Sequence, residues 1–134
     1  MTAIPALTPA EFAIMKALWR AGDATVADVR AVLAESGSEA AYTTVMTLLG
    51  RMVQKGAVTV DRSREPFVYA AAVRKQHVAR QRLREFLRDV FDNDAETLVL
   101  GLVEDAALSV DELRHLEGRL DALREAERKG KPKP

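Results

Sequence analysis

The alternation of apolar and polar positions divides the chain into helical segments and one short segment with the period of β-strands. Four helix starts carry a residue that can cap a helix, followed three positions later by an acidic side chain. These pairs are Thr8 with Glu11, Thr25 with Asp28, Asn93 with Glu96, and Ser109 with Glu112. They predict a mainly helical protein.

The first part of the chain has the pattern of three helices and a hairpin. Apolar spacing predicts helices over about residues 9–20, 26–35 and 41–55, the last ending at Gly56, which suits a left-handed C-terminal cap. Two short β-branched stretches follow, "AVTVD" and "FVYAA", separated by the polar turn "RSREP". This element order predicts a winged helix-turn-helix DNA-binding domain over residues 1–73.

Three further apolar stripes predict amphipathic helices in residues 74–127. The stripes are Leu83, Phe86, Leu87, Val90 and Phe91; then Leu98, Val99, Leu102 and Val103; then Leu113, Leu116, Leu120 and Leu123. Three short helices can hardly bury these side chains alone, so we expect a helical dimerisation domain that packs against a second copy. The alternative is that the helices fold back onto the first domain. The basic tail, residues 128–134, is expected to be disordered.

Composition excludes several classes of protein. The 134 residues are 48% hydrophobic and 30% charged, as in ordinary globular domains. No apolar run approaches the ~18 residues of a membrane span, and the N-terminus lacks a signal-peptide pattern, so a cytoplasmic location is expected. The chain has no cysteine, and His77 and His115 have no partner at ligand spacing. No metal or cofactor is therefore expected.

The net charge of zero conceals an uneven distribution. Residues 74–91 carry six basic and two acidic side chains, whereas residues 92–127 carry three basic and eleven acidic ones. The overall charge therefore says little about binding partners.

The third predicted helix has two different faces. On a helical wheel its core side consists of Val45, Leu48, Leu49, Met52 and Val53. The outward side and its flanks carry Thr43, Thr44, Met46, Thr47, Gly50 and Arg51. Threonine hydroxyls can bond to base edges and threonine methyls can contact the thymine methyl, so this side is a candidate DNA reader.

Gly50 stands out on this face, because a glycine inside a helix costs about 1 kcal/mol relative to alanine. Either the backbone approaches another surface closely there, or the glycine is merely tolerated.

Basic residues surround the face: Arg51 and Lys55 on the helix, and Arg62 and Arg64 in the hairpin turn. Such residues would contact phosphates and supply affinity, while the helix would specify sequence. Few bidentate base readers are present, so DNA shape should contribute to specificity.

Two other functions compete with DNA binding. A winged helix can be a protein-interaction module that binds no DNA, since a fold alone does not determine function. That alternative leaves the outward threonines beside basic residues unexplained.

An enzyme would need an acid/base pair, and the candidates are the adjacent carboxylates Glu104 with Asp105 and Asp111 with Glu112. Within each pair the two side chains point about 100° apart on a helix, so neither pair is suited to acid/base catalysis. No phosphate-binding loop or nucleophile motif is present, so we predict that the protein is not an enzyme.

Four segments carry a resemblance to a known family: "LTPAEFAIMKALW", "AYTTVMTLLGRMVQKGAV", "FVYAAAV" and "LVLGLVEDAALSVDELRHLEGRLDAL". From about Leu7 to Leu123 the chain resembles the BlaI/MecI (penicillinase repressor) family of bacterial transcriptional repressors. The resemblance implies a homodimer that binds inverted-repeat operators with TACA/TGTA-like half-sites. The residues that it places at DNA bases are Thr43, Thr44, Met46 and Thr47.

The resemblance also bears on Tyr42, on the wing and on regulation. Tyr42 matches the family motif although the wheel places it at the core edge; a phosphate contact from its hydroxyl would reconcile the two. Arg62 and Arg64 would be wing contacts. In β-lactam-responsive members a membrane sensor protease, acting itself or through a downstream protease, triggers cleavage in the C-terminal region, typically at an Asn-Phe bond. The matching positions here are Gly101 and Leu102, which depart from that pattern.

Overall fold

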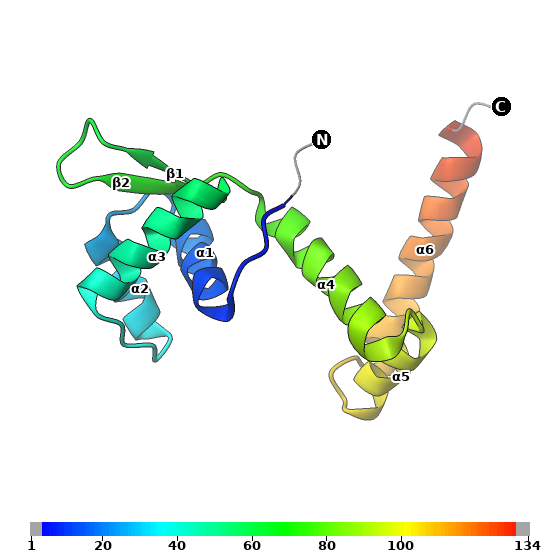
Figure 1. The fold of residues 1–134 in the computed structure, drawn as a ribbon. Coiled ribbons are helices and arrows are strands. Elements are labelled where there is room, and N and C mark those ends of the chain that lie inside the picture. Colours follow the sequence, from blue (N-terminus) through cyan, green and yellow to red (C-terminus); the bar gives the residue numbers. More distant parts are fainter. Residues whose placement is uncertain (1–3, 131–134) are drawn as a thin grey trace. The chain divides into compact units, whose positions relative to one another are not determined.

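The computed structural model describes residues 4–130, and within that range it contains six helices and one β-hairpin (Figure 1). In chain order the elements are α1 (Pro9–Ala21), α2 (Val26–Glu35), α3 (Tyr42–Lys55), β1 (Val58–Asp61), β2 (Val68–Ala71), α4 (Lys75–Phe91), α5 (Ala95–Glu104) and α6 (Val110–Gly130). The mainly helical class with a small hairpin is confirmed. The chain forms two compact units, one up to Leu83 and one from Arg84.

Helices α1 and α2 begin where their capping residues predict. The Thr8 hydroxyl accepts a hydrogen bond from the backbone N–H of Glu11, whose carboxylate accepts one from the Thr8 N–H. Thr25 and Asp28 form the same reciprocal pair. Each pair satisfies two N–H groups at the helix start that have no partner within the helix.

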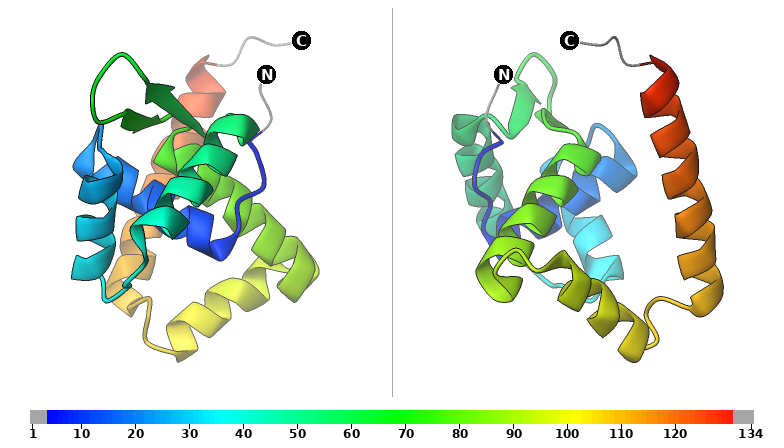
Figure 2. Two further views of the ribbon diagram at one scale, coloured as in Figure 1. Left: turned by 60° about the vertical axis from the view of Figure 1, so that its left-hand side comes forward. Right: turned by 90° about the vertical axis from the view of Figure 1, so that its right-hand side faces the viewer.

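The core of the first unit lies where α1, α2, α3 and the hairpin meet. Figure 2 shows this three-helix arrangement from two further sides. On α3 the buried side chains are Val45, Leu49 and Met52, and Leu48 and Val53 are half-buried beside them. The core side of the wheel is therefore confirmed. Burying an aliphatic side chain of this size stabilises the fold by about 1.5–3 kcal/mol, so this face anchors α3 firmly.

The hairpin is tied to the helices by a contact that the sequence did not predict. Strand β1 pairs antiparallel with β2, with Val58 opposite Ala71. Ala24, between α1 and α2, then forms a bridge to Tyr69, with its N–H 2.9 Å from the Tyr69 carbonyl and its own carbonyl 2.7 Å from the Tyr69 N–H. The sequence indicated only a helix break at this point. The bridge fixes the hairpin relative to α1 and α2.

The first unit includes the first turns of α4. The side chain of Val78 is buried, and the Trp19 indole N–H donates to the Val73 carbonyl at 2.9 Å. These contacts hold the start of α4 to the winged helix. The compact unit therefore runs to Leu83 rather than ending at residue 73.

The helices of the second unit begin with side-chain caps, and one cap differs from the prediction. Helix α6 has the expected pair of Ser109 and Glu112. Helix α5 is capped by Asp94 instead of Asn93, and the Asp94 carboxylate accepts bonds from the N–H and the hydroxyl of Thr97. Asn93 has a φ of 65° and lies in the turn after α4. The capping signal thus operates one residue later than predicted.

Helix α6 extends into the predicted tail. It continues to Gly130, so residues 128–130 are helical and the expectation of disorder is wrong for them; residues 131–134 lie outside the described range. Arg128 and Lys129 are in the last turn, where a positive charge interacts favourably with the helix dipole and stabilises the helix. Arg128 also forms an ion pair with Glu125 at 2.9 Å. Across residues 4–130, no helix is both long enough and apolar enough to cross a membrane.

Candidate nucleic-acid interface

The polar side of α3 faces outward. Its residues are all exposed, namely Thr43, Thr44, Met46, Thr47, Gly50 and Arg51. Because the opposite side of the same helix is buried, the core fixes the direction in which these side chains point. The structure therefore presents a rigid helix whose exposed face carries hydroxyl groups, methyl groups and one guanidinium.

Tyr42 is more exposed than the wheel predicted. Its side chain is 44% exposed rather than at the core edge. Tyr42 is the first residue of α3, one turn before the first buried residue, so no neighbouring helix covers it. The hydroxyl is accordingly accessible to a partner outside the chain.

Gly50 has no packing role inside the chain. A Cβ built on it would meet no atom within 4 Å, and its backbone is that of an ordinary helix. A larger side chain would therefore fit the fold. Any need for glycine at this position has to come from a surface outside the chain.

The start of α3 lacks a side-chain cap. Its N-cap residue is Ala41, which cannot accept a hydrogen bond through its side chain, in contrast to Thr8 and Thr25 on the two preceding helices. The first N–H groups of α3 and the positive end of its dipole are thus available to an anion such as phosphate.

The wing places two arginines at the tip of the hairpin. Arg62 and Arg64 are exposed in the turn between β1 and β2. The Asp61 carboxylate shapes the turn by accepting bonds from the hydroxyl and the N–H of Ser63. These two bonds and the nearby Arg64 charge lower the pKa of Asp61 below its usual value. The Arg62 guanidinium lies 6.0 Å from the centroid of the Phe67 ring.

Lys55 has a partner inside the fold. Its ammonium lies 2.6 Å from the Glu11 carboxylate and 3.0 Å from the Ala6 carbonyl, and Glu11 is only 1% exposed. Burial raises the pKa of Glu11, but the hydrogen bonds from Lys55 and Thr8 and the Lys55 charge outweigh it and leave this pKa below its usual value. Moving Lys55 to a phosphate would leave a buried carboxylate unpaired, at a cost of several kcal/mol. This geometry argues against the predicted backbone contact of Lys55.

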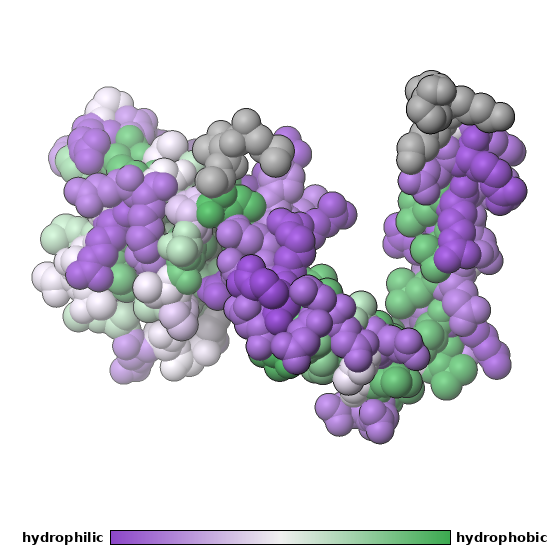
Figure 3. Space-filling model, turned by 45° about the vertical axis from the view of Figure 1, so that its right-hand side comes forward, coloured by the Kyte–Doolittle hydropathy of each residue, from purple (hydrophilic) through white to green (hydrophobic). Residues whose placement is uncertain are grey.

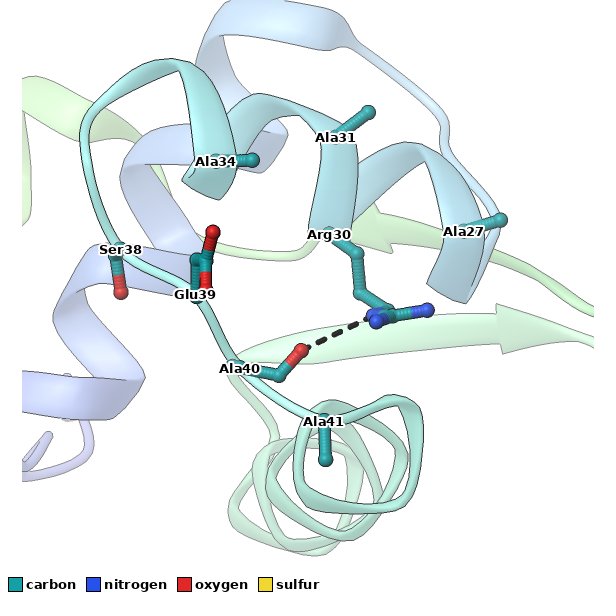
Figure 4. Close-up of a pocket in the computed structure, with 8 residues that line it drawn as sticks. All are labelled: Ala27, Arg30, Ala31, Ala34, Ser38, Glu39, Ala40 and Ala41. Atoms are coloured by element: carbon teal, nitrogen blue, oxygen red, sulfur yellow. Dashed lines mark hydrogen bonds between the residues drawn. The ribbon is translucent and has the colours of Figure 1, made fainter.

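A shallow, open pocket of about 740 Å³ lies between α2 and the turn that leads into α3 (Figure 4). Its lining residues are Ala27, Arg30, Ala31, Ala34, Ser38, Glu39, Ala40 and Ala41. The Arg30 Nε–H donates to the Ala40 carbonyl at 3.1 Å. No sequence motif marks Arg30; the one signal in the sequence is that it is the only basic residue of α2.

The apolar residues predicted to form a dimer interface are largely uncovered. The exposed members are Leu83, Phe86, Val90, Val99, Leu102, Leu116 and Leu120. The half-buried members are Leu87, Leu98 and Leu113. Figure 3 shows hydrophobic residues reaching the surface of this helical part beside hydrophilic ones. Neither α5 nor α6 has a buried side chain, and Gly101 and Leu102 lie within α5.

A three-helix core, a two-stranded wing and an exposed polar face on α3 define a winged helix-turn-helix protein. Within residues 4–130, no group of three or more histidine, cysteine, aspartate or glutamate side chains could hold a metal ion. The family model of the penicillinase repressor matches residues 7–122. The chain therefore belongs to the penicillinase repressor family; it is a DNA-binding transcriptional repressor and not an enzyme.

Two similar proteins accompany this assignment. The penicillinase repressor of Bacillus licheniformis is 25% identical over 116 residues, which cover 87% of this chain and 90% of that protein. A crystal structure of a MarR mutant from Escherichia coli covers 87% of this chain and 77% of its own, with 18% identity and a TM-score of 0.47. The family assignment confirms the resemblance found in the sequence. It favours the repressor over an interaction module that binds no DNA.

Proposed function

We propose that the protein represses transcription as a homodimer that binds an inverted-repeat operator with TACA/TGTA-like half-sites. The bound dimer would occlude a promoter, and the protein would act in the cytoplasm. The observation that carries this proposal is the exposed polar face of α3, which a buried face holds in place, in the same compact unit as the exposed arginines of the wing. In a helix-turn-helix protein the second helix of the motif lies in the major groove, and here that helix is α3.

The side chains of this surface divide into two roles. Thr43, Thr44, Met46 and Thr47 would face the bases, because they lie on the exposed side of α3 near its start. We assign the phosphate contacts to four exposed residues, Tyr42, Arg51, Arg62 and Arg64. Phosphate contacts supply affinity without sequence information, so the two groups should differ in what their loss changes.

We predict that substituting one residue of each group changes a different property of DNA binding: sequence preference for Thr47, and affinity for any duplex for Arg64. Thr47→Ala should weaken operator binding by about 25-fold and leave binding to a scrambled duplex unchanged, because a base-edge contact of about 1 kcal/mol is lost in each of the two half-sites. Arg64→Ala should weaken binding to both duplexes alike and lower the slope of log affinity against log salt by about two, one for each protomer of the dimer. Fluorescence anisotropy with labelled duplexes over a series of salt concentrations measures both effects. Equal, uniform losses from the two variants would refute the division of roles.

The dimer is supported by the uncovered apolar residues of α4, α5 and α6. Leu116 is 49% exposed and Leu120 is 47% exposed, one turn apart on α6. Contiguous apolar surface of this kind is uncommon on a monomer and marks an interaction site. A second copy offers the same surface, and two-fold pairing would close the assembly without leaving a further apolar face open.

Release from DNA by proteolysis would have to act on a helix. The bond between Gly101 and Leu102 lies in α5, and the Gly101 carbonyl accepts a hydrogen bond from the Asp105 N–H at 3.0 Å. We infer that a membrane sensor protease, or a protease downstream of it, can cut here only after α5 opens locally. Cleavage would separate α6 from the DNA-binding unit and so weaken the dimer.

If the neighbouring gene encodes a membrane sensor protease, co-expression of that protease with the repressor tests this proposal. The expected product on induction is a fragment that ends near Gly101, and operator affinity should fall with its accumulation. Intact-mass measurement and N-terminal sequencing of the second fragment locate the cut. A repressor that leaves DNA while still intact would contradict proteolytic release.

A further inference from the structure

Arg30 connects the two helices of the helix-turn-helix motif. It lies on α2 and is exposed, and its Nε–H donates to the carbonyl of Ala40, ten residues later (Figure 4). Ala40 directly precedes Ala41, the N-cap residue of α3. The bond therefore restrains the residue that precedes the N-cap of α3.

The rest of the guanidinium remains available for other contacts. An arginine side chain carries five N–H donors in a fixed planar fork, and the bond to Ala40 uses one of them. Arg30 lines the open pocket beside Ala27 and Ala31. Because these neighbours are short alanine side chains, they do not cover the terminal nitrogens of the guanidinium. One acidic residue, Glu39, also lines this pocket.

The position of Arg30 matches a known feature of DNA recognition. In a helix-turn-helix the first helix crosses the DNA backbone while the second enters the major groove. Here α2 is the first helix, and Arg30 is its only basic residue. A guanidinium beside the start of the recognition helix can therefore meet a phosphate of the strand that borders the groove.

We propose that Arg30 has two roles in operator binding: its Nε–H positions the recognition helix through Ala40, and its terminal N–H groups contact a backbone phosphate. The proposal rests on the DNA contact proposed for α3. It adds a residue on α2 that acts on sequence preference indirectly, through the start of α3, and on affinity directly, through its charge.

Two substitutions separate these roles. In Arg30→Gln the amide nitrogen occupies the place of Nε, so a donor to Ala40 is kept and the charge is lost. In Arg30→Lys a methylene group occupies that place, so the charge is kept and the donor at that position is lost. Arg30→Ala removes both. Arg20→Ala is the matched control, because it removes an exposed arginine at the end of α1 whose partner is Glu35, at 3.8 Å.

Anisotropy titrations of the full chain with an inverted-repeat TACA/TGTA duplex and a scrambled duplex, over a salt series, distinguish the variants. Arg30→Gln should lower the salt slope by about two, one for each protomer of the dimer, and keep the preference for the repeat. Arg30→Lys should keep the slope and lose about fivefold in preference. Arg30→Ala should show both changes and Arg20→Ala neither, with unfolding midpoints by circular dichroism showing that every variant folds.

Other results would overturn the proposal. If Arg30→Ala behaves like Arg20→Ala, Arg30 has no role in DNA binding. If the glutamine and lysine variants lose the same property, the two roles do not coexist. If the wild-type protein binds both duplexes equally, the proposed operator is wrong, while the salt slopes still decide whether Arg30 contacts a phosphate.

Discussion

Leu120→Glu is expected to convert the repressor from a dimer to a monomer and to lower operator affinity by about a hundredfold or more. Leu120 lies in the apolar stripe of α6, 47% exposed in the single chain. In the proposed dimer a glutamate there would be buried without a partner, at a cost of several kcal/mol. A monomer would lose the gain in affinity that comes from joining two half-site contacts in one molecule.

Sedimentation equilibrium at micromolar protein measures the assembly directly. The wild-type protein should have twice the chain mass of 14.7 kDa, and the Leu120→Glu variant should have the chain mass itself. Gly118→Glu is the matched control, because it adds the same side chain to α6 about 160° around the helix from Leu120. A Cβ at Gly118 would meet no atom within 4 Å, so this variant should remain dimeric. A monomeric wild-type protein would refute the dimer.

Lys55→Met is expected to lower the free energy of unfolding by about 2–3 kcal/mol at neutral pH, with no change in the salt slope of DNA binding. Removing the ammonium leaves the Glu11 carboxylate, 1% exposed, without its charged partner. The expected loss is below that of a fully buried pair, because the Lys55 side chain is 35% exposed. Adding Glu11→Gln should recover part of the loss, since the unpaired charge then disappears.

The pH dependence of unfolding gives this prediction a second test. In the wild-type protein the pKa of Glu11 is lowered, so the pair stabilises the fold above about pH 4.5 and this stabilisation is lost as pH falls through the lowered pKa. Without Lys55, its hydrogen bond and its charge no longer lower this pKa while burial still raises it, so the carboxyl takes up a proton at a higher pH than in the wild-type protein. The deficit of Lys55→Met should therefore shrink as pH falls from 7 to about 4.

Chemical denaturation at several pH values measures these differences. Arg88→Met is the control, because it removes a partner from the exposed pair of Arg88 and Asp89 and should change the unfolding midpoint little. An Arg88→Met effect as large as that of Lys55→Met would mean that burial of Glu11 is not the cause. A reduced salt slope in Lys55→Met would restore Lys55 to the phosphate contacts.

The direction of the Lys55 side chain depends on a residue far away in the sequence. Its position at the end of α3 beside an exposed basic face suggested a DNA contact, and the sequence contains nothing that links it to Glu11. A lysine at a helix margin can reach outward or back over its own core, since its side chain is long and flexible. Its direction here depends on a carboxylate on another helix, 44 positions earlier.

Short-range patterns determined much of this protein by themselves. Capping pairs, the helical period and the turn residues act within a few positions, so they specify where the helices and the hairpin lie and which side of α3 is apolar. The same period predicted stripes on α5 and α6 that the single chain leaves unburied. The exposed face of the recognition helix and the family could both be identified at this level.

Only the tertiary structure decided which distant residues meet. The bridge from Ala24 to Tyr69, the bond from Arg30 to Ala40 and the pair of Lys55 and Glu11 each join separate elements. No local pattern encodes such contacts, because they depend on how the elements pack around a shared core. The sequence thus determined the elements and the reading face of α3, and packing decided which charges remain available to DNA.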